Sequence, residues 1–124
     1  MSQKGSTQFA IIFTVGPEHV AEGDRIFKSH VAWISRTHHR DGEKALLQYN
    51  LSRAPQMTNP MDPSEGTTEN TCYVLTEVYA NAVGLQDHWE QAMGNWEDFG
   101  ALNEWLGKVD VQMVNGAEVV HSLW

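Results

Sequence analysis

The sequence contains few cysteines, few basic side chains and no long apolar run, and each shortage excludes a class of protein. The single cysteine among its 124 residues, Cys72, allows no internal disulfide and argues against a structural zinc site built on cysteines. The longest apolar run, residues 9–13, is far shorter than the ~18 residues of a membrane-spanning helix. With 8 basic and 16 acidic residues the net charge is −8, which disfavours binding to nucleic acid or to an anionic membrane.

The composition fits one globular domain. Length and apolar content together favour a single compact domain over residues 1–124. No apolar stretch follows Lys4, as it would in a secretory signal, so we expect a cytoplasmic protein.

Hydrophobic alternation with a period of two predicts the strands. It occurs at 8–15, 44–53, 71–79 and 109–113. The pair Asn115-Gly116 predicts a tight hairpin into a closing strand that contains Val119, His121 and Leu123.

Apolar residues at helical spacing predict helices over 17–39 and 82–106. Gly42 is the expected C-cap of the first helix, Asn81 is the N-cap of the second, and Gly94 is a break within it. Residues 54–70 contain three prolines and many polar side chains, which predicts one long flexible loop.

The order β-α-β-β-α-β with an additional C-terminal strand predicts an α+β, ferredoxin-like fold, in which both helices cover one face of an antiparallel sheet. Bulky apolar residues nevertheless fall on both faces of that sheet, and one pair of helices cannot cover both. An uncovered apolar face of this size is unusual in a soluble monomer. The sequence therefore predicts a homodimer that packs sheet against sheet.

Three groups of segments carry a family resemblance. They are AEGD at 21–24 with RTHHRDG at 36–42, YNLSR at 49–53, and EVY at 77–79 with LQDHW at 85–89. Their order and spacing resemble the dimeric α/β barrel superfamily, and within it the antibiotic-biosynthesis-monooxygenase-like group. This family includes cofactor-free oxygenases of polycyclic aromatic substrates, haem-degrading oxygenases and polyketide cyclases. The resemblance implies a homodimeric α/β barrel whose second helix lines a ligand cavity.

His88 is the leading catalytic candidate. It lies next to the apolar stripe of the second predicted helix, where an imidazole can accept or donate a proton near neutral pH. The alternative is a histidine at the core boundary that bonds to backbone or water.

Aromatic side chains supply the candidate ligand-binding surface. Five tryptophans pack the core and a dimer interface, or form a stacking surface for a flat aromatic ligand, and the two roles do not exclude each other. We assign Trp33, Trp89 and Trp96 to such a surface, together with His30, which shares the stripe of Trp33.

Three further polar residues are candidates for orienting a substrate. Asn50 belongs to a polar stripe on the second strand, which either lines the cavity or faces solvent. Burial would raise the pKa of Glu77 and make it a possible base, whereas a strand-end carboxylate is often simply solvated. Tyr79 shares the face of Glu77 and offers a phenolic donor.

No cofactor or metal is expected. The sequence has no His-x-x-x-His pair, and His38-His39 is explained by the C-terminal dipole of the first helix. Haem is disfavoured because residues 93–96 lack the ligating histidine of the haem-degrading members and residues 9–15 lack their asparagine.

The resemblance implies a cofactor-independent monooxygenase that acts on an aromatic or polyketide-like small molecule. In that reaction His88 would take the proton of a phenolic substrate, and the electron-rich anion would reduce dioxygen directly. Two alternatives remain open: a non-catalytic dimer that binds a small molecule or is associated with stress, and a cyclase or isomerase of the same fold.

Overall fold

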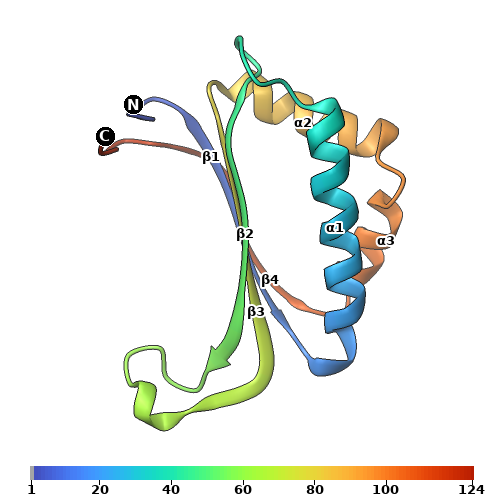
Figure 1. Cartoon of the computed structure of the whole chain (residues 1–124), viewed down its shortest axis with the longest axis vertical. Coiled ribbons are helices and arrows are strands. Elements are labelled where there is room, and N and C mark those ends of the chain that lie inside the picture. The colour runs from blue at the N-terminus through green and yellow to red at the C-terminus, as the bar shows by residue number, and fades with distance from the viewer. Residues whose placement is uncertain (1) are drawn as a thin grey trace.

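The computed structural model describes residues 2–124 and has two layers, with helices on one side of an antiparallel sheet (Figure 1). In chain order the elements are β1 (Thr7–Val15), η1 (Pro17–His19), α1 (Val20–Thr37), β2 (Leu46–Met57), η2 (Pro63–Glu65), β3 (Thr67–Tyr79), α2 (Ala82–Asn95), α3 (Phe99–Leu106) and β4 (Asp110–Glu118). The strand order is β2-β3-β1-β4. This confirms the α+β class and is compatible with the ferredoxin-like pattern predicted above.

The prediction of one loop over 54–70 is wrong at both ends. β2 continues to Met57 and β3 begins at Thr67, so only 58–66 connect the two strands. Pro55 is tolerated within β2 because this strand lies at the edge of the sheet, where a missing N–H costs least. The resulting hairpin extends beyond the helices and curls away from them (Figure 1).

The predicted hairpin at Asn115-Gly116 is also wrong. β4 runs through both residues, and no further strand follows it among the residues that the structure describes. Phe9 pairs with Asn115 and Gln8 with Ala117, which leaves Gly116 as the extra residue of a β-bulge. Gly116 has a φ of 91°. Glycine adopts such positive φ values readily in bulges as well as in hairpin turns, which is why the pair Asn115-Gly116 predicted a turn.

The helix ends differ from the prediction in two places. α1 ends at Thr37, because His38 already has an extended backbone, and Gly42 lies in the following turn rather than at the cap. The second helical region divides at Trp96–Asp98 instead of at Gly94. Asn81 does stand at the N-cap of α2, but its side chain donates to the Glu43 carbonyl instead of capping the helix.

The core lies between the sheet and the helices. Alternation along β1 buries Phe9, Ile11, Phe13 and Val15 against them. The opposite face of the sheet carries no helix, and on it Ile12 is 44% and Val114 56% exposed. Figure 1 shows the helices on one side of the sheet and both termini on the other. Within residues 2–124, no helix is long and apolar enough to span a membrane.

Candidate functional site

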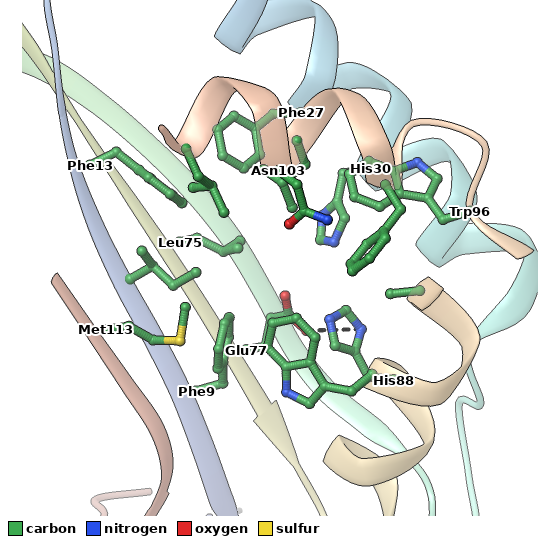
Figure 2. Close-up of a pocket in the computed structure, with 16 residues that line it drawn as sticks. Phe9, Phe13, Phe27, His30, Leu75, Glu77, His88, Trp96, Asn103 and Met113 are labelled. Atoms are coloured by element: carbon green, nitrogen blue, oxygen red, sulfur yellow. Dashed lines mark ion pairs between the residues drawn. The ribbon is translucent and has the colours of Figure 1, made fainter. Parts of the chain in front are cut away.

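A cavity of about 220 Å³ lies between the sheet and the three helices (Figure 2). Its walls are mostly apolar and include six aromatic side chains. The rings come from Phe9, Phe13, Phe27, Trp89, Trp96 and Phe99. Asn103 of α3 and Met113 of β4 also line it, and both residues are exposed to solvent.

Three ionisable side chains converge at one end of this apolar cavity. His30 of α1, Glu77 of β3 and His88 of α2 are 5%, 0% and 2% exposed. One nitrogen or oxygen atom from each lies within 4.8 Å of those from the other two. These residues are far apart in sequence, so the fold alone brings them together (Figure 2).

Glu77 faces the helices because the alternation of β3 places it there. It pairs with Phe9 on β1 and with Tyr49 on β2, so it lies on an inner strand of the sheet, and its side chain is buried rather than solvated. The Tyr79 hydroxyl donates to Glu77 Oε1 over 2.5 Å, while Oε2 is buried with no hydrogen-bond partner among the described residues. Burial raises the pKa of Glu77 to about 7, against the smaller opposing effect of the Tyr79 hydrogen bond.

His88 is held in the neutral state. Its pKa is lowered to about 2, first by burial and then by the nearby His30 and His38. Its Nδ1 lies 3.7 Å from Glu77 Oε1, the contact dashed in Figure 2. With a neutral imidazole, this contact is not an ion pair. His88 also bonds to a side chain outside α2.

That side chain is His38, whose contact with His88 was not predicted from the sequence. His38 Nε2 lies 2.8 Å from His88 Nδ1, and His38 Nδ1 lies 2.9 Å from Thr37 Oγ1. The helix-dipole interpretation of His38 therefore omits its main contact. Nothing in the spacing could reveal a contact across 50 positions.

The series of hydrogen bonds from Thr37 through His38 to His88 fixes the tautomers of the two histidines. Thr37 donates its hydroxyl proton to the Trp33 carbonyl, so its oxygen accepts from His38 Nδ1–H. Neutral His38 then accepts at Nε2, and His88 donates from Nδ1. The Nε2 atom of His88 is consequently left with a free lone pair.

His30, like His88, is held by a contact at its Nδ1 atom and has a lowered pKa. Its Nδ1 lies 2.8 Å from the Tyr49 hydroxyl, and burial lowers its pKa to about 3. Burial also raises the pKa of Tyr49 well above its ordinary value, so the phenol stays neutral.

Most of the candidates predicted from sequence meet at this cavity. His30, Glu77, His88, Trp89 and Trp96 line it. Two others stand directly behind the lining. Trp33 stacks on Trp96 with ring centroids 5.6 Å apart, and Tyr79 bonds to Glu77.

Asn50 does not line this cavity. It pairs with Thr76 on the uncovered face of the sheet, where its side chain is exposed, while its neighbours Tyr49 and Leu51 face the helices. The polar stripe on β2 therefore belongs to the other face. The apolar walls, among them Phe9 and Phe27, were missed because a hydrophobic pattern does not distinguish core from cavity.

None of the protein-family models, curated proteins or solved structures compared with this chain matches it. The family resemblance of the three sequence segments therefore stays a prediction, and the function must be argued from the site.

Proposed function

We propose that the protein is an enzyme acting on a small aromatic molecule that carries a hydroxyl group. The observation that carries this proposal is the cavity itself, whose walls are apolar and partly aromatic except at the exposed Asn103 and at the buried end formed by His30, Glu77 and His88. Flat rings pack well against such walls, and a few placed polar groups orient the ligand. A hydroxyl group is the ligand donor that the unpartnered Oε2 of Glu77 requires.

The reaction that we propose is oxygenation by dioxygen, as the sequence resemblance implies. Loss of the hydroxyl proton at the Glu77–His88 end would leave an electron-rich ring that reduces dioxygen, with one oxygen atom entering the ring as a quinone carbonyl and the other leaving as water. His88 is the acceptor predicted from the sequence, but Glu77, whose pKa burial raises to about 7 while that of His88 falls to about 2, is the stronger base at this end. Dioxygen consumption with substrate present supports this reaction. Turnover without oxygen would instead indicate a cyclase or isomerase, and binding without turnover a non-catalytic protein.

We expect 2-naphthol to bind about 10- to 100-fold more tightly than 2-methoxynaphthalene, because only the former donates a hydrogen bond to the buried carboxylate.

In Ala92→Phe the new ring would occupy the cavity, since Ala92 lines it from α2 and is 2% exposed. The affinity for 2-naphthol should therefore fall by more than about 10-fold. Isothermal titration calorimetry measures both effects. Ala32→Phe, at an exposed position of α1, is the matched control. Equal affinities in Ala92→Phe and wild type would contradict the proposal.

We also propose that two copies of the chain pack sheet against sheet. Support comes from the face opposite the helices, where the exposed Ile12 pairs with the half-buried Val74 and the exposed Val114 pairs with Ala10. Sedimentation velocity should show a dimer that Ile12→Lys converts to monomer, whereas Val31→Lys on the outer face of α1 should leave it intact. A wild-type monomer at all concentrations would contradict this.

A further inference from the structure

His30, Glu77 and His88 form a donor set that suits a metal ion as well as a substrate. Two imidazoles and one carboxylate are the ligands of many catalytic zinc sites and of mononuclear iron sites, which leave the remaining coordination positions open. The three residues come from α1, β3 and α2, so they surround one point from three directions at the closed end of the cavity (Figure 2).

Each of the three residues is held by a second contact that leaves one ligand atom free. His30 Nδ1 contacts the Tyr49 hydroxyl, and His88 Nδ1 contacts His38. Glu77 Oε1 accepts from Tyr79. Metal-binding histidines and carboxylates are typically oriented by such outer contacts through the atom that does not bind the metal. The free atoms here are the two Nε2 atoms and Glu77 Oε2.

The protonation of His88 also suits a metal ligand. The hydrogen-bond chain from Thr37 through His38 places the His88 proton on Nδ1, so the lone pair on Nε2 is available. A metal binds the neutral imidazole, and no proton has to leave this side chain first.

Glu77 lacks a positive partner. Its Oε2 is buried without a hydrogen bond, and no lysine or arginine of the described residues lines the cavity. An isolated carboxylate at such a position is costly, and buried carboxylates are normally paired or bound to a metal.

We propose that His30, Glu77 and His88 bind one divalent transition-metal ion, such as Zn²⁺ or Fe²⁺, through the two Nε2 atoms and Glu77 Oε2. Metal–ligand bonds of about 2.0–2.2 Å place ligand atoms about 3.0–3.5 Å apart. Each of the three residues already has one nitrogen or oxygen atom within 4.8 Å of those of the other two, so side-chain movements would close the site around an ion. The open coordination positions would face the aromatic walls.

This inference deepens the proposed function and rests on it for the position of the substrate hydroxyl. A hydroxyl at the Glu77 end would bind the metal ion directly, and the ion would lower its pKa as a Lewis acid. In the loaded protein the metal ion, and not Glu77 or His88, would then promote loss of the proton.

The test is a titration of chelator-treated, dialysed protein with Co²⁺, followed by visible absorption and calorimetry. We expect one Co²⁺ per chain, with ligand-field bands of nitrogen and oxygen coordination. Glu77→Gln and His88→Gln should each weaken binding by more than about 100-fold, and Tyr49→Phe, which removes only an outer contact, by about 10-fold. His121→Gln, at an exposed position, is the control and should bind as wild type does.

A wild type without a stoichiometric site would overturn the inference, as would unchanged binding in folded Glu77→Gln and Tyr49→Phe. The metal site and the proposed function fail separately in this design. Full 2-naphthol affinity in a protein that binds no Co²⁺ removes only the metal site. Stoichiometric Co²⁺ without any 2-naphthol binding removes only the proposed substrate.

Discussion

Replacing Trp33 with alanine is expected to lower the free energy of unfolding by about 3–5 kcal/mol. Trp33 is fully buried, and its indole stacks on Trp96 and donates from Nε1 to Asn95 over 2.7 Å. The substitution removes this hydrogen bond and leaves a large void, because the sheet and helices relax only partly. A loss of this size is a large part of the ~5–15 kcal/mol that stabilises a typical domain.

Trp33→Ala should also disturb the candidate site, because Trp33 lies directly behind its lining. Its ring is 4.9 Å from that of His38 and 5.6 Å from that of His88, so both imidazoles would lose a supporting wall. Urea unfolding followed by circular dichroism measures the stability. Val31→Ala, at a 46% exposed position of the same helix, is the control and should change stability by less than about 0.5 kcal/mol. A loss below about 1 kcal/mol in Trp33→Ala would contradict the packing described here.

Replacing Glu77 with glutamine is expected to stabilise the metal-free protein at pH 8 by about 3 kcal/mol and to have little effect at pH 4. The amide oxygen can still accept from Tyr79, so the packing is kept. In wild type, burial raises the pKa of Glu77 from 4.5 to about 7. Between these values the unfolded chain releases a proton that the folded chain retains, so wild-type stability falls as pH rises through this window.

The measurement is urea unfolding at pH 4, 6 and 8 with a chelator present. The difference between Glu77→Gln and wild type should appear between pH 4.5 and 7 and stay constant above it. Glu69→Gln, an exposed position on the same strand, is the control and should follow wild type. A glutamine variant that is less stable than wild type at pH 8 would show that the carboxylate has a partner that this account lacks.

The order of strands and helices was predictable because it depends on local periodicity. The alternation of β1 and β3 and the helical stripe of α1 gave those elements within a few residues. The errors fall where tertiary context overrides local signals. Pro55 is accommodated in an edge strand, and Gly116 makes a bulge rather than a turn.

The site was predictable residue by residue but not as an assembly. His30, Glu77 and His88 were singled out because ionisable side chains beside apolar stripes suggest a cavity. Their convergence, and the contact of His88 with His38, depend on how α1 and α2 cross the sheet, and no spacing in the sequence records that crossing. Asn50 was misplaced because a polar stripe on a strand does not reveal which face it occupies.

The most direct test of the central claim is a crystal structure of the protein soaked with 2-naphthol. The account predicts that the rings lie among Phe9, Trp89 and Trp96, with the hydroxyl oxygen directed at the Glu77–His88 end of the cavity. Density for the ligand only on the uncovered sheet face, or with the hydroxyl turned toward Met113 and solvent, would contradict it.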